Sequence, residues 1–167
     1  MMLLERLLRK KVFEDPGVKR ALGRYVRIVL GEGKPYYLLN KDKLGEKIRR
    51  AEEIVERCSF CERKCGVNRK KGELGWCRVG YEARVASAFT HLGEEPELVP
   101  SGTIFFSGCN FRCVYCQNWD ISQFPEAGSV MKPEKVARWI ESSGCINMNF
   151  VGGEPTPNLH WILKILK

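Results

Sequence analysis

The chain has 167 residues, of which 44% are hydrophobic and 29% charged, with a formal net charge of +8. This composition is ordinary for a globular protein and excludes disordered and collagen-like classes. No run approaches the roughly 18 apolar residues that a membrane-spanning helix needs. The N-terminal stretch "MMLLERLLRKKVF" is too interrupted by charges to be a signal-peptide apolar region. We therefore expect a cytoplasmic protein that has no membrane partner.

The positive charge is spread over the chain, and only the run Arg69–Lys71 is compact. A nucleic-acid-binding stripe would be more clustered and would carry interleaved aromatic residues. We interpret the charge as a solvated basic surface and regard nucleic acid as an improbable partner. The chain also has eight cysteines. In a reducing compartment, cysteines indicate metal ligands or catalytic thiols before disulfides.

Residues 1–57 are predicted to form an N-terminal helical region. Leucines at helical spacing predict a first amphipathic helix over residues 2–12. A second helix is expected to begin with Asp15 as N-cap and Pro16 at its first position. A third apolar stripe, within residues 42–57, predicts a helix that delivers the chain to Cys58.

Residues 58–100 are expected to form a metal-binding and linker module. Its four cysteines have the spacing C-x2-C-x3-C-x11-C and are Cys58, Cys61, Cys65 and Cys77. The segment around them is rich in glycine and lysine and poor in apolar residues, so it cannot pack a core of its own. Bound metal would supply the missing folding energy. The spacing does not distinguish one zinc ion from an iron–sulfur cluster, and reduced thiols without metal are the alternative.

Residues 101–167 read as strand, helix, strand, helix. The segment "TIFFS" predicts a buried strand, residues 133–144 a helix, "INMNFV" a second strand, and a second helix begins near Thr156. This alternation is typical of parallel strands joined by crossover helices, as in an α/β barrel or open sheet.

The first of these strands leads directly into three cysteines with the spacing C-x3-C-x2-C: Cys109, Cys113 and Cys116. In α/β folds the C-terminal ends of the strands carry the active site. A structural zinc site would close its shell with four ligands. Three thiolates on a [4Fe–4S] cluster instead leave one iron open for a substrate or cofactor. The alternative is a zinc knuckle that borrows His91 or His160.

The second strand leads into the segment "GGEPT", which is expected to reach the same end of the sheet. Gly152 and Gly153 would allow main-chain groups to approach a ligand closely, and the Glu154 carboxylate could accept hydrogen bonds from an ammonium group. Alone this segment would be an ordinary turn. Its pairing with the three cysteines on a successive strand makes it a strong signal.

These motifs resemble those of radical S-adenosylmethionine (SAM) enzymes. The cysteine triplet, with Tyr115 before the last cysteine, is similar to that family's signature, and residues 152–154 are similar to its methionine-amine-binding motif. The resemblance implies a [4Fe–4S] cluster held by the three cysteines and SAM on the fourth iron. SAM would be cleaved reductively to a 5′-deoxyadenosyl radical that abstracts hydrogen from a substrate. Gly152, Gly153 and Glu154 would bind the methionine part of SAM, and Tyr115 would lie near the adenine.

Several longer segments are similar to the pyruvate formate-lyase activating-enzyme-like branch of this family: "CSFCERKCGVNRKKGELGWC", "HLGEEP", "SGTIFFSGCNFRCVYCQNWDISQ" and "NMNFVGGEPTPNL". The similarity covers about residues 55–167. It implies an electron donor such as ferredoxin or flavodoxin, and activation of a partner protein. The substrate and the donor are not specified by the sequence.

The family's barrel has six strand–helix units, implying on the order of 180 residues if an eight-unit barrel takes about 250. Residues 101–167 are expected to supply the first two units of such a partial (β/α)6 barrel, preceded by the helical and Cys-rich modules. We therefore expect a truncated chain or a partner chain that completes the barrel, and two parallel strands with an exposed apolar edge. The alternatives are a zinc-stabilised binding module and a non-catalytic remnant.

Overall fold

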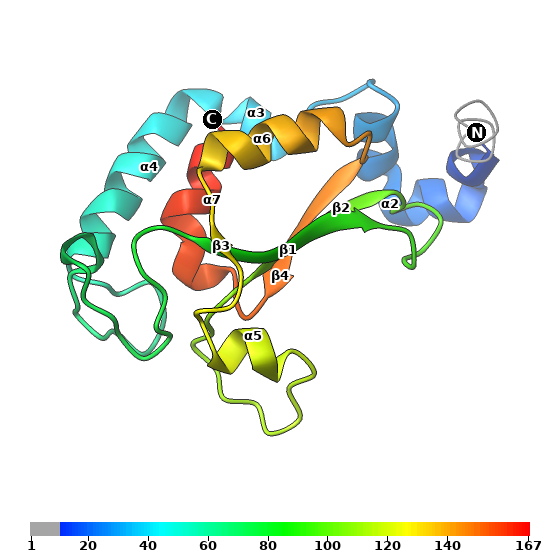
Figure 1. The fold of residues 1–167 in the computed structure, drawn as a ribbon. Helices are drawn as coiled ribbons and strands as arrows, with labels where there is room; N and C mark the ends of the chain where they lie inside the picture. The colour runs from blue at the N-terminus through cyan, green and yellow to red at the C-terminus, as the bar shows by residue number, and fades with distance from the viewer. Residues whose placement is uncertain (1–10) are drawn as a thin grey trace.

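The computed structural model describes residues 11–167 and shows a mixed α/β fold around one four-stranded sheet (Figure 1). The helix predicted over residues 2–12 lies, up to residue 10, outside the described residues. Within the described part of the chain, no helix is long and apolar enough to cross a membrane. The α/β class expected from the sequence is confirmed.

Helices α2 (Pro16–Val29), α3 (Tyr36–Leu39) and α4 (Lys41–Glu56) come before the sheet in the chain. Helix α2 begins as predicted. The Asp15 carboxylate accepts the backbone N–H groups of Gly17 and Val18 at 2.7 and 3.0 Å, which satisfies two donors that the first helical turn leaves free. Helix α4 buries Leu44, Ala51 and Val55, which share one face at helical spacing.

The sheet has the strand order β3-β1-β2-β4. Its strands are β1 (Arg84–His91), β2 (Ser101–Phe106), β3 (Ser129–Val130) and β4 (Asn147–Gly152). Strands β2 and β4 are parallel, as predicted. Strand β1 pairs antiparallel with β2 and so covers one edge that the sequence led us to expect exposed. The sheet therefore joins segments on both sides of residue 100.

The crossover from β2 to β4 contains α5 (Trp119–Gln123), β3 and α6 (Pro133–Ser142). After β4 come the 3-10 turn η2 (Thr156–Asn158) and helix α7 (Leu159–Ile165). Helices α6 and α7 lie along one side of the sheet and pack against each other, and α4 packs against α7 (Figure 1). The loop that carries α5 lies on the other side of the molecule from α6.

The core lies between the sheet and helices α6 and α7. It is formed by Ala83, Val85, Ile104, Phe106, Val136, Trp161 and Ile162. Phe106 meets Trp161 edge to face at 5.6 Å between ring centroids, and the Trp161 indole N–H donates to the Met131 carbonyl at 2.9 Å. Burying an aromatic ring of this kind contributes strongly to stability, provided that its polar atom has a partner.

His160 is buried where α7 meets the loop before β1. Its ring stacks between Phe60 and Tyr81, with centroid distances of 5.8 and 5.4 Å. Its Nε2 lies 2.7 Å from the Tyr81 carbonyl, so this nitrogen carries the proton and donates it. Burial lowers the pKa of His160 to about 4, more than the Tyr81 carbonyl raises it. The charges nearby are those of Arg69, Glu52 and Lys164.

This pKa predicts a loss of stability in acid. The folded state keeps His160 neutral, whereas the unfolded chain takes up a proton below pH 6.5, so stability falls as the pH falls from 6.5 toward about 4. Between about pH 7.5 and about pH 4.5 the loss due to His160 is on the order of 2 kcal/mol. Chemical denaturation over this range checks it. The His160→Gln variant, which can still donate to Tyr81, should lose correspondingly less; equal losses in both proteins would contradict the prediction.

Candidate metal centre

The three-cysteine loop (residues 109–116) and the segment GGEPT (residues 152–156) leave the sheet at the same end. The register of the parallel strands pairs Phe106, the last residue of β2, with Gly152, the last residue of β4. Because the two strands are parallel, the chain segments after them continue in the same direction. The sequence prediction that these two motifs share one end of the sheet is therefore confirmed.

The two segments touch through their backbones. The Gly153 N–H donates to the Phe106 carbonyl at 2.8 Å. A Cβ added at Gly153 would lie only 2.0 Å from the Gly108 carbonyl oxygen, and one at Gly152 only 2.4 Å from the Phe106 nitrogen. Gly152 also has a φ of +95°, which side-chain-bearing residues rarely adopt. These glycines therefore allow a contact with the residues just before Cys109 that any other residue would prevent.

The three thiols of the loop differ in exposure. Cys109 is buried, Cys116 half-buried and Cys113 exposed. The Cys109 sulfur accepts the Phe111 N–H at 3.3 Å, and the Cys116 sulfur lies 3.4 Å from the Ser122 hydroxyl. Within residues 11–167, no three Cys, His, Asp or Glu side chains are arranged to hold a metal ion. The donor set nevertheless fits an iron–sulfur cluster, because it combines three thiols on one loop with hydrogen bonds to sulfur.

The electrostatics of Cys109 disfavour a free thiolate. Burial raises the pKa of the Cys109 thiol above its ordinary value, and the nearby Glu154, Cys116 and Cys113 raise it further. The Phe111 N–H acts in the opposite direction. Without a metal, this thiol therefore stays protonated at neutral pH, and metal binding must displace its proton.

Glu154 and Tyr115 lie in different surroundings. The Glu154 Oε1 accepts the Thr156 backbone N–H at 3.0 Å and also the Thr156 hydroxyl, so the carboxylate is fixed at the start of η2. The charge of Glu154 raises the pKa of the Cys109 thiol, so the carboxylate is near enough to the three-cysteine loop to act on it electrostatically. The Tyr115 side chain is 83% exposed, within a loop whose Phe111 and Val114 are also exposed.

The four cysteines of residues 58–77 are brought together. Cys58, Cys61, Cys65 and Cys77 all line one small pocket. The pocket lies in the loops that follow α4, and Pro157 of η2 also lines it. Burial raises the pKa of the Cys77 thiol. His160 lies nearby, but its ring is stacked on Phe60 and its Nε2 is bonded to a carbonyl.

The structure adds contacts between the two cysteine-containing segments that the sequence analysis missed. The Arg63 guanidinium lies 4.2 Å from the centroid of the Trp76 ring, and that of Arg112 lies 5.1 Å from it. Arg63 also donates to the Asn110 carbonyl at 3.3 Å. Isolated arginines and a tryptophan in Gly-rich loops give no periodic signal, so the sequence alone could not have identified these contacts.

Strand β4 carries two asparagine side chains that make polar contacts with other segments. The Asn147 side chain donates to the Leu98 carbonyl at 2.7 Å and to the Tyr25 hydroxyl at 3.0 Å. The Asn149 side chain donates to Glu94 at 2.7 Å and to the Ser101 hydroxyl at 3.0 Å. These asparagines therefore hold the sheet to the segment before β2.

Comparison with known proteins supports a family for this site. The model of the radical SAM superfamily matches residues 103–167, which contain both motifs. Uncharacterized protein MJ0674 of Methanocaldococcus jannaschii is 48% identical over 128 residues, covering 72% of this chain and 37% of that protein. Uncharacterized protein MJ0808 of the same organism is 32% identical over 119 residues, covering 60% of this chain and 35% of that protein. No solved structure matches.

The family match supports the radical SAM superfamily for the part of the chain that carries the three-cysteine loop and GGEPT. The four-stranded α/β sheet is consistent with part of a radical SAM fold. Members of this superfamily generally bind a [4Fe–4S] cluster and SAM. The chain spans little more than a third of the length of the two relatives.

The glycine contact can be tested with one methyl group. Gly153→Ala should destabilise the protein by about 3 kcal/mol, because the added Cβ meets fixed backbone rather than a movable side chain. Gly45→Ala is the matched control: Gly45 lies in α4 with open space around it, and the change should stabilise by about 0.5–1 kcal/mol. Urea denaturation measures both. Equal stability of the Gly153→Ala variant and the unaltered protein would show that the two loops do not make this contact.

Proposed function

We propose that this chain provides the cluster-binding and SAM-binding part of a radical SAM protein. Cys109, Cys113 and Cys116 hold a [4Fe–4S] cluster, and its fourth iron is the position at which SAM binds. The observation that carries this proposal is the backbone contact between Gly153 and Gly108, which sets Glu154 beside Cys109. The family match over residues 103–167 supports the same assignment.

The residues around the open iron have distinct tasks. The three thiolates bind iron, and the Phe111 N–H stabilises the sulfur of Cys109. The Glu154 carboxylate accepts the amino group of the methionine part, with Thr156 holding it in place. Gly152 and Gly153 pack on the backbones of Phe106 and Gly108 and so hold this segment where it meets the same ligand. When bound, the reduced cluster supplies the electron that cleaves SAM to methionine and a 5′-deoxyadenosyl radical.

We place the protein in the pyruvate formate-lyase activating-enzyme-like branch, with a ferredoxin or flavodoxin as electron donor and a protein as the substrate that loses hydrogen. Phe111, Val114 and Tyr115 of the three-cysteine loop are exposed apolar and aromatic side chains. Their exposure supports the proposal that another protein surface packs against this loop. Tyr115 is proposed to contact the adenine of SAM.

Anaerobic reconstitution with iron and sulfide tests the cluster. The unaltered chain should take up iron and sulfide and show the broad visible absorbance of an iron–sulfur protein. Cys113→Ala should lose the bound iron and this absorbance, because the two remaining thiolates are too few to hold the cluster. Cys145→Ala is the matched control, since Cys145 lies away from the loop and contacts Thr90. Equal iron at the loop in the Cys113→Ala and Cys145→Ala variants would refute the cluster assignment.

The role of Glu154 is tested by Glu154→Gln, whose amide oxygen can still accept the Thr156 N–H. Loss of the negative charge should weaken SAM binding by about tenfold or more, because a charge-assisted hydrogen bond is lost. The iron content should stay the same. Equilibrium binding of SAM to the reconstituted protein measures the effect. An unchanged SAM affinity would remove Glu154 from the binding site while leaving the cluster assignment intact.

A further inference from the structure

The strongest unexplained group in the molecule is Arg69, which is only 1% exposed. Its guanidinium donates to the Gly80 carbonyl and to the Pro157 carbonyl, the latter at 2.7 Å. Within residues 11–167, no carboxylate forms an ion pair with it. A buried arginine remains charged and needs a compensating negative charge. A sulfur atom lies close to it, since Cys58 Sγ is 4.0 Å from Arg69 Nη1.

The pocket beside Arg69 is small and lined by thiols. Cys58, Cys61, Cys65 and Cys77 all line it, and its volume is about 10 Å³. This is the space of a single water molecule or ion. One metal ion with four sulfur ligands matches this small space more closely than a four-iron cluster with its bridging sulfides does.

The pocket is formed by two segments, one with Cys58, Cys61 and Cys65 and one with Gly75 and Cys77, and backbone contacts hold them close together. Cys58 and its neighbours form a closed turn, with the Cys58 N–H donating to Val67 and the Gly66 N–H donating to the Cys58 carbonyl, both at 3.0 Å. The second segment approaches through Gly75, where an added Cβ would lie 2.9 Å from the Cys65 sulfur. The Trp76 N–H also donates to that sulfur at 3.4 Å. Backbone N–H groups directed at sulfur are what thiolate ligands require.

We propose that Cys58, Cys61, Cys65 and Cys77 bind one zinc ion and that the buried Arg69 is the counter-ion of this site. Four thiolates around a divalent ion carry a net double negative charge, which supplies the compensation that Arg69 lacks. The thiols line the pocket without surrounding a common point. In the zinc-bound protein we expect rotation of these side chains to bring the four sulfur atoms around one point. Zinc is favoured because a closed set of four thiolates is its usual structural site.

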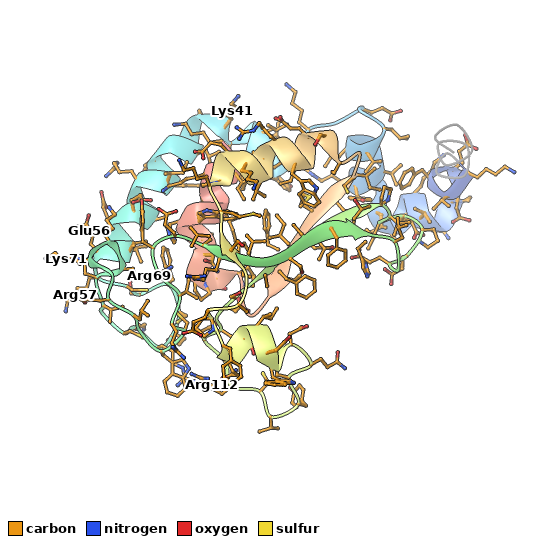
Figure 2. The ribbon with its side chains drawn as sticks, viewed as in Figure 1. Lys41, Glu56, Arg57, Arg69, Lys71 and Arg112 are labelled. Carbon is orange, nitrogen blue, oxygen red and sulfur yellow. The ribbon has the colours of Figure 1, made fainter. Side chains whose placement is uncertain are left out.

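The zinc site also fixes the neighbouring three-cysteine loop, a consequence that rests on the proposed function. Arg63 lies between Cys61 and Cys65, and Trp76 directly precedes Cys77, so the ion orders both. Arg63 donates to the Asn110 carbonyl, and Trp76 stacks with Arg112, so both residues contact the three-cysteine loop. Arg69 holds Pro157, three residues after Glu154. Figure 2 shows Arg69 within the loops below the end of α4 and Arg112 on the loop beside α5.

Metal analysis of the full chain tests the zinc site. The unaltered protein should contain about one zinc ion per chain, and cobalt(II) added in its place should give the intense sulfur-to-cobalt charge-transfer band of a tetrathiolate. Cys61→Ser should lose the zinc and the band. Cys113→Ala, the matched control, should keep both. Absence of zinc and of the cobalt band from the unaltered chain would overturn the proposal, as would iron and sulfide bound at these four cysteines.

Competition between the protein and a chelator for cobalt(II) tests the role of Arg69. Arg69→Gln should weaken the metal affinity by about tenfold or more, because a buried compensating charge is lost. Lys71→Gln removes the same charge from an exposed side chain nearby and should change the affinity little. Equal effects of the two changes would refute the counter-ion role. Circular dichroism confirms that each variant is folded.

The zinc and iron measurements fail independently. Zinc without iron in the reconstituted unaltered chain would refute the proposed function and leave the zinc site standing. Iron without zinc would do the reverse. If both are bound, Cys61→Ser should also lower the iron taken up at the three-cysteine loop, and unchanged iron uptake would refute the link between the two segments.

Discussion

The structure depends on one close backbone contact, in which Gly153 meets Gly108 and Phe106. Two parallel strands end side by side, and their following loops approach so closely that neither Gly152 nor Gly153 could carry a side chain. This contact brings two separate sequence motifs together at one end of the sheet. It also explains why both glycines are needed for reasons of packing, independently of any ligand that they bind.

The core provides the rigid support for this contact. Phe106, the last residue of β2, is fully buried and packs on Trp161 of α7, so the starting point of the three-cysteine loop is fixed from the helical side. Helix α7 in turn begins just after GGEPT and carries His160 into the layer between Phe60 and Tyr81. The segment with four cysteines therefore rests against the same helix that supports the candidate metal centre.

The electrostatics of the molecule follow from where its charges are buried. Most basic groups lie at the surface, where solvent and carboxylates compensate them; Lys70, for example, pairs with Glu52 and Glu56. Arg69, the neighbouring residue, is buried among carbonyls and sulfur. Two neighbouring basic residues therefore lie in different surroundings, and only the buried Arg69 needs a negative charge in the interior of the protein.

The sequence by itself determined the local features of this protein. It specified the Asp15 cap, the stripe of α4, the alternation of strand and helix from residue 101, and the spacing of both sets of cysteines, because each depends on neighbours within a few positions. Only the tertiary structure decided that β1 covers the edge of β2, that Arg69 is buried beside the four thiols, and that Arg63 and Arg112 meet at Trp76. Such contacts join residues far apart in the chain and depend on packing, which leaves no periodic trace in the sequence.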